Sequence, residues 1–84
     1  MPRGIVFCAG GLAALAALQG DDVGASRLWG LVERLEDEHG RLDATERLYY
    51  RDIVGELAHE SYSETRHVDA EEALRLVYAC VHST

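Results

Sequence analysis

Cysteine and proline are scarce in this chain, and their scarcity narrows the possible folds. The 84 residues include two cysteines and one proline, and the cysteines, Cys8 and Cys80, form no C-x-x-C motif. A disulfide framework is therefore not expected. Both cysteines fall on apolar faces of expected helices, which predicts buried core thiols. One proline and little clustering of β-branched residues favour an all-helical fold.

Basic charge is also scarce. Eight Lys and Arg residues stand against 15 Asp and Glu residues, so the net charge is −7. A nucleic-acid-binding face needs a basic stripe, and acidity disfavours an anionic membrane surface, so neither is an expected partner. The apolar fraction of 48% is too high for a disordered chain, and it suits one small helical domain over residues 1–84.

Long hydrophobic runs are absent as well. The apolar run over residues 5–18 is shorter than the roughly 20 residues that cross a bilayer. Together with Arg3 it also resembles the start of a secretory signal, but no convincing A-x-A cleavage site follows it. We therefore expect a buried first helix in a cytoplasmic protein. A small secreted helical protein with an N-terminal signal segment stays open as an alternative.

Apolar spacing predicts four helices. The first helix is apolar nearly all round and is expected to be central. Gly20 and Gly40 fit the left-handed position that ends a helix, and aspartates precede the later helices as N-caps. Because the connecting loops are short, successive helices should be neighbours in a four-helix antiparallel array. The expected ranges are 5–19, 22–39, 43 to about 61–63, and 69 onward.

Residues 12–35 have the spacing of a tetratricopeptide-like helical hairpin. Small and large apolar residues recur on both arms, and a Gly-Asp pair separates the arms. A hairpin of this kind cannot bury its apolar face alone, so it needs neighbours. Trp29 is expected to fill the space between the first three helices, or alternatively to mark an exposed contact surface. The positions in this pattern are Leu12, Ala13, Gly20, Asp21, Ala25, Trp29 and Val32.

Five segments of the chain are informative because of the order in which they occur. The segments are GLAALAALQGD at 11–21, ASRLWG at 25–30 with Glu33 and Leu35 after it, ATER at 44–47, ETR at 64–66, and DAEEA at 69–73. In this order they resemble the last helices of large actinobacterial transcriptional regulators of the LuxR and antibiotic-regulator types. Those regulators have a signal-transducing P-loop ATPase followed by tetratricopeptide-like helices. The resemblance implies a scaffold segment of such a regulator that acts through protein contact.

The chain departs from that family in five respects. Thr65 replaces a usual Gly, Trp29 replaces a usual Leu, and the third helix is shorter by about two turns. No G-x-x-x-x-G-K-[ST] motif occurs, so nucleotide binding is not implied and no cofactor is expected. The helix-turn-helix module that often follows is also missing. The resemblance therefore implies a detached or truncated C-terminal segment.

Catalytic and metal-binding patterns are weak. Ser26, Ser61 and Ser63 lack a supporting motif such as G-x-S-x-G, so no catalytic residue and no enzyme activity is predicted. Glu56 and His59 have the E-x-x-H spacing of dimetal helical bundles, but a dimetal site needs a second copy. A solvated helix face is the expected role. A small metal-binding helical protein remains the alternative.

The first helix is the expected contact surface. Its apolar side chains point in too many directions for one neighbouring hairpin to cover. We therefore predict a protein partner or self-association, with a homodimer as one form. The candidate interaction residues are Ile5, Phe7, Leu12, Leu15 and Trp29.

Overall fold

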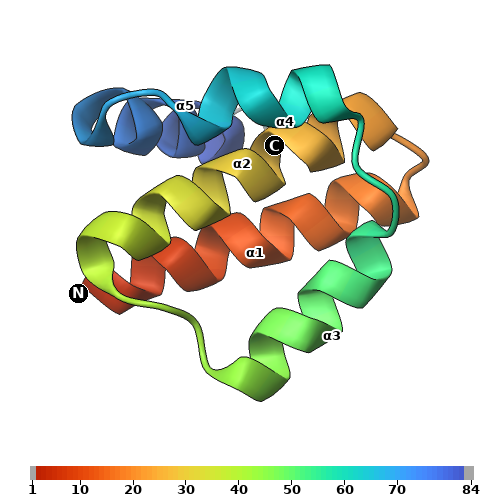
Figure 1. Cartoon of the computed structure of the whole chain (residues 1–84), viewed down its shortest axis with the longest axis horizontal. Coiled ribbons are helices and arrows are strands. Elements are labelled where there is room, and N and C mark those ends of the chain that lie inside the picture. Colours follow the sequence, from red (N-terminus) through yellow and green to blue (C-terminus); the bar gives the residue numbers. More distant parts are fainter. Residues whose placement is uncertain (1, 83–84) are drawn as a thin grey trace.

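The computed structural model describes residues 2–82, and this part of the chain contains five α-helices and no strand (Figure 1). The predicted all-α class is confirmed for these residues. The predicted number of four helices is wrong, because the third expected helix is two separate helices. The helices are α1 (Pro2–Leu18), α2 (Asp22–His39), α3 (Ala44–Val54), α4 (His59–Arg66) and α5 (Ala70–His82).

Gly55 divides the third expected helix. It has a φ of +71°, which side chains other than glycine rarely adopt, and its N–H donates to the Arg51 carbonyl as a C-cap. The chain then turns, and α4 starts after Ala58, whose N–H donates to the Ser26 hydroxyl of α2 at 2.8 Å. The hydroxyl of Ser26 therefore helps to place the start of α4 against α2.

Several other helix ends follow the sequence prediction, although α1 begins at Pro2 rather than at residue 5. The Asp21 carboxylate accepts from the Gly24 N–H at 2.9 Å, and Asp69 accepts from the Glu72 N–H at 2.8 Å. Gly20 and Gly40 both adopt positive φ values. Gly20 and the Asp21 cap fix the turn between α1 and α2. These two helices run side by side in opposite directions (Figure 1).

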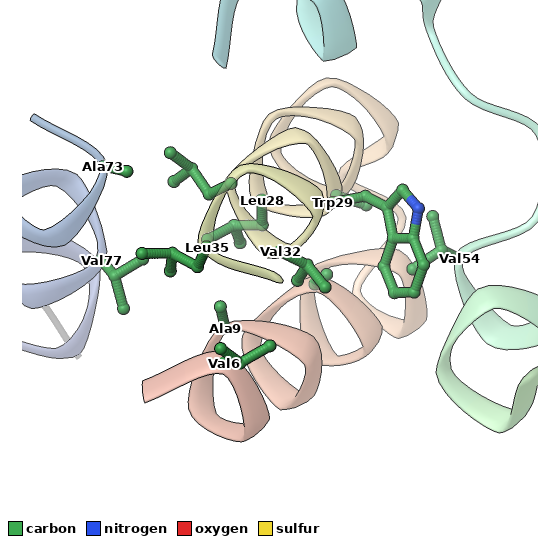
Figure 2. Close-up of a cluster of buried hydrophobic side chains, with 12 residues drawn as sticks. Val6, Ala9, Leu28, Trp29, Val32, Leu35, Val54, Ala73 and Val77 are labelled. Atoms are coloured by element: carbon green, nitrogen blue, oxygen red, sulfur yellow. The ribbon is translucent and has the colours of Figure 1, made fainter. Parts of the chain in front are cut away.

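The central helix is α2, and the prediction that the first helix would be central is wrong. Helix α2 contacts each of the other four helices. In Figure 2 it is seen end-on, with α1 below it, α5 on one side and α3 on the other. Helix α1 has a buried side that includes Val6, Ala9 and Ala13, while its opposite side is exposed. The core residues are Val6, Ala9, Ala13, Ala25, Leu28, Trp29, Leu31, Val32, Leu35, Val54, Ala73 and Val77.

Trp29 is a core residue. Its side chain is 0% exposed and lies beside Val54 of α3 (Figure 2). The Arg47 guanidinium of α3 lies 5.5 Å from the centre of the Trp29 ring, within range of a cation–π contact. The indole Nε1 has no hydrogen-bond partner among residues 2–82. This burial confirms the packing prediction, and it corrects the assignment of Trp29 to an interaction surface.

Helices α2 and α4 approach each other closely at Gly30. A Cβ atom at Gly30 would lie 2.1 Å from the Thr65 hydroxyl oxygen and 2.6 Å from the Tyr62 carbonyl oxygen. The Thr65 hydroxyl donates to the Arg27 carbonyl at 2.6 Å. A glycine is therefore needed at position 30 for α4 to lie at this distance from α2.

Candidate interaction surface

One side of α1 is apolar and exposed. A helix repeats every 3.6 residues, so the residues opposite Val6, Ala9 and Ala13 share a second face. Phe7 is 48% exposed, Leu15 45% and Leu18 74%. No charged residue lies between positions 4 and 18. We define the α1 face as Gly4, Phe7, Cys8, Gly11, Leu15 and Leu18.

Helix α3 extends this apolar surface. The rings of Phe7 and Tyr50 meet edge-on with centroids 5.8 Å apart, and those of Tyr49 and Tyr50 are 5.7 Å apart. Tyr49 is 64% exposed and continues this surface. Leu48 is 70% exposed but lies on the other side of α3, beside Arg51 and Asp52. We define the α1–α3 face as the α1 face together with Tyr49.

Glycine allows α3 to lie close to α1. A Cβ at Gly10 would be 3.0 Å from a ring carbon of Tyr50, so the phenol ring packs directly onto the α1 backbone. Burial raises the pKa of Tyr50, and the nearby Glu46 carboxylate raises it further. The aromatic row from Phe7 through Tyr50 to Tyr49 therefore joins the two parts of the α1–α3 face into one surface.

The predicted interaction residues fall into three groups. Phe7 and Leu15 lie on the α1–α3 face, whereas Ile5 and Leu12 are half-buried and pack against the core. Trp29 is fully buried. The candidate interaction residues did not include Leu18 or Tyr49, which are exposed. For Leu18 a signal was available, because it continues the helical spacing of Phe7, Gly11 and Leu15 along one face.

The two cysteines differ in exposure. Cys8 lies on the α1 face and is exposed, so the prediction of a buried core thiol is wrong for this residue. Cys80 is half-buried on α5. The prediction failed at Cys8 because the first helix is apolar all round, and its composition does not show which side faces the core.

A network of charged side chains joins α2 to α3 and α4. Arg47 of α3 pairs with Glu33 at 3.1 Å and with Glu36 at 3.2 Å, and Arg66 of α4 pairs with Asp37 at 2.8 Å. Glu36 is only 7% exposed and also accepts from the Leu42 N–H at 3.1 Å. Because the buried Glu36 carboxylate has a charged partner, this network fits a structural clamp between the helices.

The ionisation of the Tyr62 phenol can be used to test this clamp. Its phenol donates to the Glu33 carboxylate, and burial, followed by this hydrogen bond, raises the pKa of Tyr62. A folded-state pKa above the unfolded value of about 10 means that the neutral phenol stabilises the fold. This contribution is fully present below about pH 10 and is lost as pH rises through the folded-state pKa.

We expect Tyr62→Phe to make unfolding less dependent on alkaline pH than it is in the wild type. The measurement is the urea midpoint at several pH values between 9 and about 11.5. Tyr78→Phe is the control, because Tyr78 is exposed and should leave the wild-type pH dependence intact. Equal alkaline slopes for Tyr62→Phe and the wild type would contradict a phenol held by Glu33.

The residues considered for chemistry do not form a metal or catalytic cluster. Glu56 lies in the loop before α4, and His59 is the first residue of α4, so their spacing is not on a helix as predicted. Between residues 2 and 82, no three His, Cys, Asp or Glu side chains are placed to hold a metal ion. Ser26 is buried and accepts from the Ala58 N–H, which gives it a structural role.

The outer side of α5 differs from the α1–α3 face. It has an exposed aromatic residue, Tyr78, but also charged residues such as Glu72 and Arg75, which pair at 2.9 Å. The outer side of α5 therefore serves as a matched control region for experiments on the α1–α3 face.

Among the described helices, none has both the length and the hydropathy of a membrane-spanning segment.

Together, these features define a small all-α protein with an uncharged, apolar face on its first helix. Comparisons with protein-family models, curated proteins and solved structures found no match to the chain.

Proposed function

We propose that this chain is a non-catalytic helical module for protein–protein interaction or oligomerisation, and that the α1–α3 face is its contact surface. The exposure of Phe7, Leu15 and Leu18 on an uncharged helix face is the observation that supports this proposal most strongly. Isolated exposed apolar residues are ordinary, but a continuous apolar patch marks an interaction site.

The size of the patch fits this role. The exposed fractions of its large side chains, with residue areas of roughly 150–250 Å², correspond to about 400 Å² of surface. The largest patch on a typical monomer is about 300–600 Å² and is often functional. The α1–α3 face therefore falls within this range for a chain of only 84 residues. The large side chains counted here are Phe7, Leu15, Leu18 and Tyr49.

The proposal includes a relationship to the scaffold helices of the regulators named above, acting in the cytoplasm. It is supported by the antiparallel α1–α2 hairpin, in which Ala13 and Ala25 are buried small residues beside the buried Trp29. In a tetratricopeptide-like array each hairpin stacks on a neighbour, and a terminal hairpin without one presents an apolar face. The module would then hold a partner or a second copy rather than carry out a reaction.

The proposal predicts concentration-dependent association that depends on the α1 face. Light scattering across a concentration series should show a mass above that of the monomer for the wild type. Leu15→Glu/Leu18→Glu should remain monomeric, because burying two new carboxylates without partners is costly. Tyr78→Glu places a carboxylate on the outer side of α5 and should associate like the wild type.

A hydrophobic dye adds a second measurement. If the wild type stays monomeric, its exposed face should still bind anilinonaphthalene sulfonate more strongly than the Leu15→Glu/Leu18→Glu variant does. Circular dichroism must show equal helix content in all three proteins. A monomeric wild type with the same dye binding as this double variant would overturn the proposal.

A further inference from the structure

We infer that the α1–α3 face binds a second copy of this chain, with the two α1 helices antiparallel and crossing at Gly11. The inference rests on the proposed function, because it assigns an occupant to the same face. In such an isologous dimer the same patch is used by both copies, and it must be complementary to itself.

The side chains of the α1 face are self-complementary in size. A two-fold axis at Gly11 places residue 4 opposite residue 18 of the second copy, because each is seven positions from Gly11. Leu18, at 74% exposure, then meets the partner's Gly4, where a Cβ would have no atom within 4 Å. Phe7 meets the partner's Leu15, because each is four positions from Gly11. Large residues thus face small or apolar ones along the whole helix.

Gly11 allows close approach at the crossing point. It lacks a side chain, and a Cβ built there meets no atom of the monomer within 4 Å, so this side of the backbone is open. Small residues at a crossing point let two helix backbones come close enough for their neighbours to interdigitate. Because nothing inside the monomer requires a glycine at position 11, its side-chain-free surface suits an external helix.

Charge favours a second copy over a charged partner. The chain has a net charge of −7, yet α1 presents no charged side chain between residues 4 and 18. A basic partner would find no carboxylate on α1, whereas two α1 helices can pair without bringing like charges of those helices into contact. The nearby Glu46 belongs to α3, which flanks the paired helices.

The area of the face is also appropriate for a dimer. A stable interface buries about 800 Å² on each partner. The large apolar side chains of the α1–α3 face supply about 400 Å² of this. Gly4, Cys8 and Gly11 add the backbone and small-side-chain area between them. Tyr49 is needed for this total, so α3 should flank the paired α1 helices.

The first test is Gly11→Leu. A leucine at the crossing point should keep the helices apart and raise the dimer dissociation constant about tenfold or more. The same change should not lower the urea midpoint of the dilute monomer, because Leu favours a helix more than Gly does. A Gly11→Leu variant that dimerises as tightly as the wild type would overturn the crossing at Gly11.

The second test distinguishes the orientation of the helices by oxidation in a Cys8→Ser background. Gly11→Cys should form an intermolecular disulfide in high yield, because residue 11 lies on the two-fold axis. Leu18→Cys should not, because the two positions would be about 21 Å apart along the helix axis. Mass spectrometry of the tryptic peptide over residues 4–27 separates these links from any link through Cys80.

Each outcome has one interpretation. A disulfide from Gly11→Cys alone supports the antiparallel dimer. Equal disulfide yields from Gly11→Cys and Leu18→Cys would indicate parallel helices, which overturns the inference but leaves the proposed function intact. A folded monomer that yields no disulfide overturns the second copy as occupant. If this monomer still binds the hydrophobic dye through Leu15 and Leu18, the proposed function again survives.

Discussion

Truncation of Trp29 to alanine should remove a large part of the free energy that stabilises the folded protein. The indole is fully buried between α2 and α3, and the Arg47 guanidinium lies over its ring. Removing a buried aromatic side chain costs about 3–5 kcal/mol, because burial is lost and a cavity remains. A small domain has a total stability of only about 5–15 kcal/mol, so a large part of it would be lost.

Urea unfolding followed by circular dichroism measures this loss. Tyr78→Ala is the matched control, because it removes an exposed aromatic side chain and should change the free energy of unfolding by less than about 0.5 kcal/mol. Trp29→Phe should retain more stability than Trp29→Ala, since it keeps a ring and removes an indole N–H that has no partner within residues 2–82. A Trp29→Ala variant with the wild-type urea midpoint would contradict the packing.

Gly30→Ala should destabilise the domain although alanine is the better helix former. The new methyl group would lie 2.1 Å from the Thr65 hydroxyl oxygen and 2.6 Å from the Tyr62 carbonyl oxygen, so α4 must move away from α2. Overpacking of this kind costs about 1–3 kcal/mol. The cost should exceed the gain of about 0.5–1 kcal/mol in helix propensity.

Gly11→Ala provides the matched comparison for Gly30→Ala. Gly11 is also inside a helix, but its added methyl group would enter open space. At protein concentrations where the wild type is monomeric, this variant should gain up to about 1 kcal/mol in the free energy of unfolding. If Gly30→Ala raised stability as Gly11→Ala should, the close contact between α2 and α4 would be wrong.

Local signals predicted much of the secondary structure. The caps at Asp21 and Asp69 and the glycines at 20 and 40 define their helix ends through bonds within one turn of the chain. The end of α3 was missed, because Gly55 lies inside an apolar pattern that continues on both sides. The start of α4 is held by the hydrogen bond from the Ala58 N–H to the Ser26 hydroxyl, and Ser26 is 32 positions away in the sequence.

Tertiary packing could not be predicted to the same extent. The first helix has apolar residues on every side, so its composition could not show that Phe7 and Leu15 face outward while Val6 and Ala13 face α2. On α2 a polar stripe shows which side of the helix faces solvent, and α1 has no such stripe. The candidate contact residues were therefore placed on α1 without a choice of side, and two of them, Ile5 and Leu12, pack against the core.

The most direct test of the central claim is a dilution series followed by ¹H–¹⁵N correlation spectra of the wild-type protein. This measurement reports each backbone amide separately, so it locates the association surface without any substitution. Self-association through the α1–α3 face predicts concentration-dependent shifts for Gly11, Leu15, Leu18 and Tyr49, with no shift for Tyr78 on the outer side of α5. Spectra that do not change with concentration, or shifts centred on Tyr78, would contradict the account.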